Sequence, residues 1–393
     1  MTTLLAFALC LLSAVLISKL AERTVLSTAV LFLFAGMLLA LPAVGVMKLK
    51  PSDPIVRELA ELALFSVLFT DGMKLGVSNL VHSWRLPIRA LVLGLPLTLF
   101  GTAVLAHFIA SLPWTESFLL GAILSPTDPV FVAAIVGRQE IPARVRNLLN
   151  VESGLNDGLA LPIVLLLLAR ISSFESSMPH LVFELAAGLA IGIAIPWIVF
   201  KIENTRIFAA STSYAPLLPV SIALLVLSLC WATGANEYLA AFAAGICTAS
   251  FGTQACGAFH EIGEAVTEIL KLAALMVFGA LFSLSFLWDV SWQGYVFAVL
   301  AVIAVRPAAL AVAFIGRFLP WREFVTAAWF GPKGFASVTY SLIVLEARAS
   351  LGDVIFRLAA VVIAISIVAH SSTDVPVSKW LVSHSGPEAE QPA

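Results

Sequence analysis

The chain has little charge and little cysteine. Only 12% of its 393 residues are Asp, Glu, Lys or Arg, the formal net charge is −2, and no charge block divides the sequence. That net charge by itself says nothing about nucleic acid, and we expect no nucleic-acid partner. The four cysteines lack CxxC or other metal-site spacing, and we interpret them as packing residues in apolar segments. They are Cys10, Cys230, Cys247 and Cys256.

Sequence signatures of several enzyme classes are also missing. No GxxxxGK[ST] string is present, so the sequence offers no P-loop for ATP. No GxGD or HExxH string is present either, and these are motifs that an intramembrane hydrolase would use. We expect that the protein is not an enzyme and that it needs no cofactor.

Apolar residues are abundant. They make up 60% of the chain, and the mean hydropathy is +1.02, which is typical of membrane proteins. Because about 20 apolar residues cross a bilayer as a helix, the pattern predicts an all-α polytopic protein with about thirteen transmembrane helices. The predicted spans are 4–20, 24–46, 58–74, 86–110, 116–137, 147–170, 181–200, 214–232, 236–251, 266–287, 293–316, 322–345 and 353–372.

The spans belong to one predicted membrane domain, 1–380, followed by a short tail, 381–393, that we expect to be disordered and cytoplasmic. Most basic residues in the connections, Lys271 among them, fall on the same side as the C-terminus. The positive-inside rule then places the C-terminus in the cytoplasm and the N-terminus outside a plasma membrane. The loop before Arg57 argues the other way.

Charged residues near the middle of spans are expensive and indicate function or pairing. They are Asp128, Glu152, Asp157, Arg306 and Lys333. In span 147–170, Glu152 and Asn156 share one helix face, and Ser153 and Asp157 share the adjacent face. These two polar stripes are predicted to point into the protein.

Two spans contain residues that interrupt a helix. Ser125–Pro129 has two prolines, and Gly331–Gly334 reads GPKG. Each break creates a helix N-terminus, which Asp128 has the sign to compensate, and a helix C-terminus, which Lys333 has the sign to compensate. The broken spans are the fifth and the twelfth, seven apart, which predicts inverted repeats of spans 1–6 and 8–13 with two crossing broken helices.

These strings carry a family resemblance. ESGLNDG at 152–158, SPTDPV at 125–130, Arg306-Pro307 and GPKG at 331–334 resemble the cation:proton antiporters of the NhaP type, relatives of the eukaryotic sodium/proton exchangers. Phe69–Gly72 and Gly234–Gly245 are also similar to their counterparts there. The resemblance covers the whole chain and implies a homodimer formed by a scaffold region and a mobile core that carries the ion.

The resemblance also implies roles for single residues. Asp157 would take either the cation or the proton, Ser153 and the backbone around Thr127 would complete the cation site, and Asp71 would be a further ligand. The resemblance also implies that Glu152 pairs with Arg306 and that Asn156 lies near this pair. This chain has Lys333 where many relatives have arginine, which keeps the charge but not the bidentate geometry.

A carboxylate suits this chemistry because Na⁺, Li⁺ and K⁺ prefer oxygen ligands and the same oxygen accepts a proton. If the two exclude each other, flux one way forces counterflux. Asn156, where electrogenic relatives have a second aspartate, predicts one proton per cation. Three assignments stay open: Ser153 could bond to its own helix, Asp128 could serve the ion or only the helix end, and Glu152–Arg306 could handle the ion. A bile-acid-type symporter and a cation channel are the alternative functions.

Overall fold

The computed structural model describes most of the chain, and the account below concerns those residues. They are 2–21, 28–51, 53–74, 85–128, 141–171, 178–205, 208, 211, 214–282, 286, 288–316, 319–347 and 349–383. All regular secondary structure within these ranges is helical.

The first half of the chain contributes α1 to α10. Their bounds are α1 Thr2–Ala21, α2 Thr28–Ala40, α3 Pro54–Lys74, α5 Arg85–Arg89, the π-helical segment η1 Ala90–Gly94, α6 Leu95–Phe108, α7 Trp114–Ile123, α9 Ala143–Ile171 and α10 Met178–Glu203.

The second half contributes α11 to α19. Their bounds are α11 Leu217–Thr233, α12 Glu237–Phe251, α13 Thr253–Ala280, α15 Trp292–Leu300, the π-helical segment η3 Ala301–Val305, α16 Arg306–Ala313, α17 Trp321–Trp329, α18 Phe335–Glu346 and α19 Gly352–Val382.

Five continuous helical stretches are long and apolar enough to cross a membrane. Several shorter apolar helices accompany them, α2, α11, α12 and α18 among these. Tryptophan begins α7, α15 and α17, and Trp114, Trp292 and Trp321 are all exposed there. Such placement is typical of the aromatic belt at a membrane interface. The five stretches are Leu86–Phe108, Ala143–Ile171, Pro179–Glu203, Trp292–Ala313 and Gly352–Val382.

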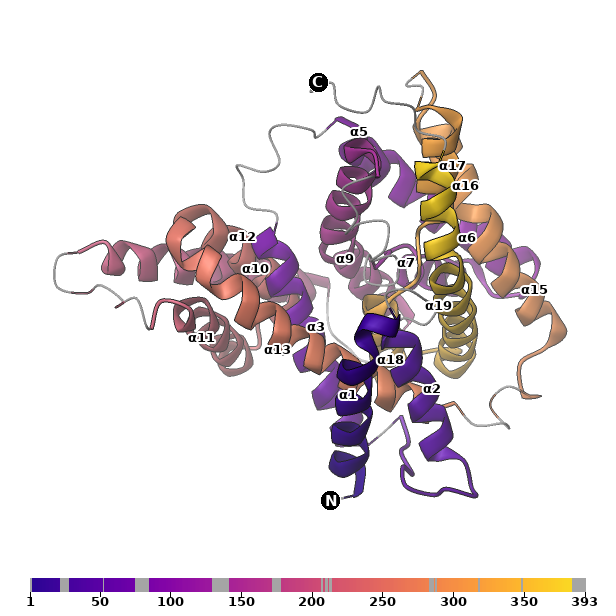
Figure 1. The fold of residues 1–393 in the computed structure, drawn as a ribbon, viewed down its shortest axis with the longest axis horizontal. Coiled ribbons are helices and arrows are strands. Elements are labelled where there is room, and N and C mark those ends of the chain that lie inside the picture. Colours follow the sequence, from indigo (N-terminus) through magenta and orange to yellow (C-terminus); the bar gives the residue numbers. More distant parts are fainter. Residues whose placement is uncertain are drawn as a thin grey trace.

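The helices form two groups in space (Figure 1). One contains α3, α10, α11, α12 and α13, and the other contains α5 to α9 and α15 to α19, with α18 drawn where the two meet. Within the first group α12 packs against α3 and α10, and α13 packs against α3 and α2. Within the second, α6 packs against α7, α7 against α9, and α18 against α19. Helix α9 contacts α3 and α12 as well as α7, so it lies between the groups.

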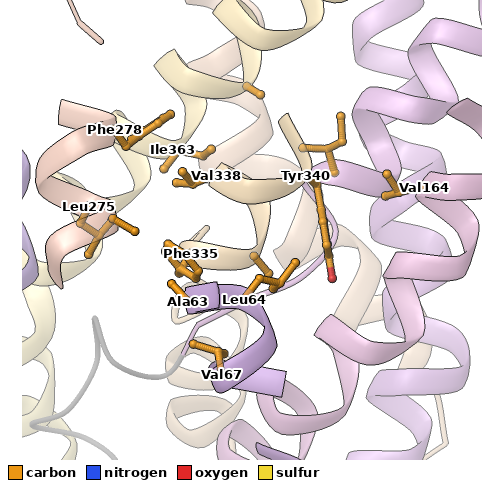
Figure 2. Packing of buried hydrophobic residues seen from close by; sticks show 14 of the residues in the cluster. Ala63, Leu64, Val67, Val164, Leu275, Phe278, Phe335, Val338, Tyr340 and Ile363 are labelled. Atoms are coloured by element: carbon orange, nitrogen blue, oxygen red, sulfur yellow. The ribbon is translucent and has the colours of Figure 1, made fainter. Parts of the chain in front are cut away.

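Buried apolar side chains fill the space around α18 (Figure 2). Leu64 comes from α3, Phe278 from α13, Val164 from α9, and Phe335 and Tyr340 from α18, and each is fully or almost fully buried. Lipid tails are as apolar as these side chains, so dispersion contacts from close packing, more than removal from water, hold the helices together.

Two spans contain short π-helical segments. Leu95 donates its N–H to Ala90 O, five residues earlier, and η3 widens the other span at 301–305. Pro96 and Pro307 follow at the second position of α6 and α16 and have no N–H for the carbonyls of Val92 and Ile303. The π turns absorb that mismatch. These spans, 86–110 and 293–316, are also seven apart in the predicted order.

One predicted span is displaced. The expected helix at 266–287 begins at Thr253 and ends at Ala280 as α13. Lys271, which the orientation argument counted in a connection although it falls inside the expected span, lies within α13 and is only 5% exposed. Helix α19 also continues past the predicted end at 372 to Val382, so the start of the expected tail is helical.

Candidate cation site on helix α9

Helix α9 positions four polar side chains inside the protein. Glu152, Ser153, Asn156 and Asp157 are all buried, with Asn156 at 0% exposure. Their spacing of one helical turn gives the two adjacent polar stripes that the sequence predicts. Both stripes face protein rather than lipid.

The two interrupted segments meet beside these residues. Residues 126–128 and 330–334 are not helical. The backbone N–H of Asp128 donates to the carbonyl of Pro332 at 2.9 Å, and Asp128 Oδ2 accepts from the N–H of Phe335 at 3.2 Å. Phe335 is the first residue of α18, so the Asp128 carboxylate lies at a helix N-terminus, where negative charge is favourable. Residues 129–137 of the predicted span 116–137 lie outside the described residues.

Glycine permits the close approach of these segments. A Cβ on Gly334 would overlap the Asp128 side chain, and a Cβ on Gly331 would overlap the guanidinium end of Arg306. Both neighbours are polar groups fixed by hydrogen bonds. The glycines of the GPKG string therefore interrupt the helix and also leave space for the side chains of Asp128 and Arg306, which pack against this segment.

Glu152 and Arg306 form a bidentate ion pair. Arg306 Nη1 donates to Glu152 Oε1 at 2.5 Å and Nη2 donates to Oε2 at 2.9 Å. Both side chains are about 5% exposed. The Arg306 Nη2 also donates to the carbonyl of Ala327 in α17 at 3.3 Å. The contact implied by the family resemblance is thus present, and it ties α9 to α16 and α17.

Asp157 has a different environment. Its side chain is 5% exposed, and its Oδ1 is buried without a hydrogen-bond partner among the described residues. The preceding residue, Asn156, donates from its Nδ2 to Thr127 Oγ1 at 2.8 Å, and Thr127 Oγ1 lies 3.3 Å from Ser153 Oγ, one turn before Asp157 on α9. The side-chain oxygen of Asn156 also has no partner in this part of the chain. Unpaired carboxylate and amide oxygens and two hydroxyls therefore cluster at α9.

Asp71 lies on α3, one turn before its end. Its Oδ1 is 3.6 Å from Lys74 Nζ, and its side chain is 18% exposed. The structure records no hydrogen bond between Asp71 and Asp157, but the charges of Asp71 and Asp128 both act on Asp157. Asp71 is thus an electrostatic neighbour of the site.

Lys333 is buried at the second break, four residues after the last residue of α17. Its Nζ has no hydrogen-bond partner among the residues described, although its backbone N–H donates to Ser366 Oγ at 2.8 Å. The last carbonyl of α17, that of Trp329, instead lies 2.9 Å from His370 Nε2. His370 Nδ1 lies 3.1 Å from Ser366 Oγ and 2.7 Å from Ser366 O. The hydrogen bond at this helix C-terminus therefore comes from α19.

Several contributors carry no motif in the sequence. Tyr340 of α18 donates its hydroxyl to the backbone carbonyl of Asp157 at 2.7 Å and is fully buried. The other two such residues are His370, which contacts the Trp329 carbonyl, and Lys271, which pairs with Glu268. A polar residue inside an apolar helix was the available signal for each, but it does not identify the partner.

No three His, Cys, Asp or Glu side chains are grouped to hold a metal ion within the described ranges. An alkali cation at α9 would therefore need hydroxyl, amide or carbonyl oxygens beside the Asp157 carboxylate. Oxygens of these kinds lie within one turn of Asp157 on α9, at Ser153 and Asn156, and at Thr127, which contacts both.

The fold and the site define a class: a helical membrane protein whose interrupted helices meet beside a buried carboxylate, an arrangement typical of secondary transporters. The profile of the sodium/hydrogen exchanger transmembrane family matches residues 7–380, and the chain belongs to this family. Such a family consists of transporters rather than enzymes.

Individual relatives are distant. The chain is 22% identical over 396 residues to the K(+)/H(+) antiporter NhaP2 of Shewanella baltica, covering 95% of this chain and 68% of that protein. It is 28% identical over 326 residues to the probable Na(+)/H(+) antiporter C3A11.09 of Schizosaccharomyces pombe, covering 76% of this chain and 42% of that protein. The chain thus spans only part of the length of these relatives.

The fold is similar to a solved structure. The sodium proton antiporter MjNhaP1 from Methanocaldococcus jannaschii at pH 8 superposes with a TM-score of 0.80 at 19% identity, covering 98% of this chain and all of the other. At that identity the likeness concerns the fold.

Proposed function

We propose that the protein exchanges a monovalent cation for a proton across the membrane, with Asp157 as the group that carries either ion. The observation that carries this proposal is the contrast between two carboxylates on α9. Glu152 is fully engaged by Arg306, whereas Asp157 Oδ1 is buried and free among the described residues. A buried carboxylate without a basic partner is stable when it binds a proton or a cation.

The neighbouring oxygens supply the rest of a cation site. Ser153 and the Thr127 segment contribute hydroxyl and carbonyl oxygen, and Asn156 fixes the Thr127 hydroxyl by its 2.8 Å hydrogen bond. Asp71 and Asp128 add negative charge within electrostatic reach. Hard cations such as Na⁺, K⁺ and Li⁺ favour a set of this kind.

The protein exchanges the two ions if its binding site moves from one side of the membrane to the other only when it holds a cation or a proton. A cation and a proton then exclude each other at Asp157, and transport of one forces return of the other. Family membership favours this reading over a bile-acid-type symporter or a channel. The two relatives are named for K⁺ and for Na⁺ respectively, and both ions belong in the test.

The test uses vesicles that contain the purified protein and an imposed pH gradient. Added Na⁺, K⁺ or Li⁺ should dissipate the gradient with wild-type protein and not with Asp157→Asn. The matched control is Asp353→Asn, which changes an exposed aspartate at the start of α19. Full exchange by Asp157→Asn would remove this residue from the carrier role, and proton flux parallel to the cation would indicate a symporter.

The proposed exchange moves one proton per cation, because the residue beside Asp157 is the neutral Asn156 rather than a second carboxylate. A current measurement on the same vesicles checks this. Exchange without net current is expected, and a transport rate that follows the membrane voltage would contradict it.

The wider architecture is part of the proposal. Thirteen spans in two inverted repeats are supported by the helix breaks in spans 116–137 and 322–345 and by the π segments in spans 86–110 and 293–316, each pair seven spans apart. The C-terminus is proposed to be cytoplasmic in a plasma membrane. Reaction of cysteines placed at Asp353 and Lys379 with a membrane-impermeant reagent, from opposite sides only, would support that orientation.

A homodimer is also proposed. Helix α10 is the least buried of the five long apolar stretches, since only 17% of its most apolar part is buried within the protein. Its exposed faces can therefore contact lipid or a second copy of the chain. The mass of the protein in detergent, measured by light scattering, should equal two chains, and a mass of one chain would contradict this.

A further inference from the structure

Helices α3 and α13 share a line of polar contacts that is separate from the Asp157 hydroxyl cluster. At its outer end Lys74 Nζ lies 3.4 Å from Glu264 Oε1 and 3.6 Å from Asp71 Oδ1. Further along, Thr267 Oγ1 lies 2.9 Å from Thr70 Oγ1 and 2.6 Å from Ser66 Oγ. Residue numbers rise on α13 as they fall on α3, so the two helices are antiparallel.

Lys271 continues this line by one helical turn beyond Thr267. Its side chain is 6% exposed, and its Nζ lies 2.6 Å from Glu268 Oε2. Glu268 is 39% exposed, so the pair has one buried and one accessible member. A buried lysine in a membrane helix requires a charge partner, and here the partner that neutralises it is the more exposed of the two residues.

The charge of Lys271 also reaches the carboxylates of the proposed site. Thr267, one turn before Lys271, contacts Thr70, the neighbour of Asp71, so this part of α13 packs against α3 beside Asp71, and the Lys271 charge is within electrostatic reach of Asp71, Asp128 and Asp157. No hydrogen bond joins Lys271 to any of them, since its recorded partner is Glu268. The positive charge is thus held near the site but outside the set of candidate ligands.

We infer that Lys271 is a tethered positive charge that sets the affinity of the Asp157 site for its cation, and that Glu268 controls how strongly it acts. This rests on the proposed function. A fixed positive charge lowers cation binding, and the negative charge of Glu268 offsets part of that effect. The two residues therefore have opposite effects, although they form one ion pair.

The test measures the half-saturation concentration for the cation and the maximal exchange rate. Lys271→Gln should lower the half-saturation concentration by roughly fivefold or more, the usual size of an electrostatic coupling between two sites. Glu268→Gln should raise it. The double variant should lie between the two, Lys271→Arg should resemble the wild type, and the maximal rate should change little.

The matched control is the pair Arg57–Glu61 on α3, 2.8 Å apart, in which Arg57 also lies 2.6 Å from Glu346. Arg57→Gln and Glu61→Gln should leave the half-saturation concentration unchanged. A merely structural role for Lys271–Glu268 predicts shifts of the same sign in both single variants, and that result, or no shift, would overturn the inference. If Lys271→Gln does not fold, Glu268→Gln and Lys271→Arg still decide, because only the first should weaken binding.

The two failures are distinguishable. If wild-type protein does not exchange any cation for protons, the proposed function fails. If the wild type exchanges and the opposed shifts are absent, only the role of Lys271 fails.

Discussion

The guanidinium of Arg306 holds both oxygens of Glu152, and so it leaves Asp157, five residues later on the same helix, without its charge. One turn and a half of α9 therefore carries one neutralised carboxylate and one that is open to a mobile ion. The difference arises from α16, since its Arg306 follows the π turn at 301–305 and binds Glu152 rather than Asp157.

Removing one partner of the Glu152–Arg306 pair should destabilise the protein more than it changes ion affinity. A buried charge left alone costs about 3–5 kcal/mol. Arg306→Ala and Glu152→Gln should therefore lower the thermal unfolding temperature and the folded yield in detergent. A well-folded Arg306→Ala protein with an altered half-saturation concentration would show instead that the pair handles the ion.

Replacing Asp128 should weaken the contact between the two non-helical segments, 126–128 and 330–334. Asp128→Asn removes negative charge from the N-terminus of α18, which is worth up to about 2 kcal/mol in a partly buried setting. We expect a lower unfolding temperature and slower exchange. Asp353→Asn, at the exposed N-terminus of α19, is the matched control and should change both much less. Equal effects of the two substitutions would contradict a special role for Asp128.

Alanine at Gly334 should separate the interrupted segments. Its methyl group would overlap the Asp128 side chain, which is hydrogen-bonded to Phe335 and cannot move without losing that bond. Exchange should fall to a small fraction of the wild-type rate. Gly101→Ala in α6 meets only a methyl group of Val305, at 3.1 Å, and should retain exchange. Vesicle assays of both variants check this.

The hydroxyl of Thr127 should contribute to cation affinity. Thr127→Val keeps the shape of the side chain and removes the 2.8 Å hydrogen bond from Asn156. A loss of about 1 kcal/mol would raise the half-saturation concentration about fivefold. Ser153→Ala should act in the same direction. Ser228→Ala, whose hydroxyl bonds only to the Leu224 carbonyl of its own helix, is the control and should leave affinity unchanged.

Hydropathy and a few strings predicted much of this arrangement. Runs of apolar residues set the positions of α9, α10 and α15–α16, and the prolines and glycines of 125–129 and 331–334 mark where helices stop. The sign of Asp128 predicted that this residue compensates a helix N-terminus, and its carboxylate accepts the N–H of Phe335, the first residue of α18. Asp157, Ser153 and Thr127 stay predictions as ion ligands.

Other features depend on tertiary contacts that no local pattern encodes. Helix α13 is amphipathic, so its polar face lowered the hydropathy of its first half, and the predicted span began at 266 rather than at Thr253. Lys333 was expected at a helix C-terminus because of its charge, yet His370 from a distant helix contacts that carbonyl. Tyr340 reaches Asp157 from α18 across 183 residues of sequence. Sequence periodicity predicts which face of a helix a residue lies on, but the residue that its side chain contacts depends on how the helices pack.

The most direct test of the central claim measures protons released when the purified protein binds its cation. In weakly buffered solution at a pH where the site is protonated, wild-type protein should release about one proton per bound cation, and Asp157→Asn should release none. Cation binding by the wild type without proton release, or the same release by Asp157→Asn, would contradict a single carboxylate shared by the two ions.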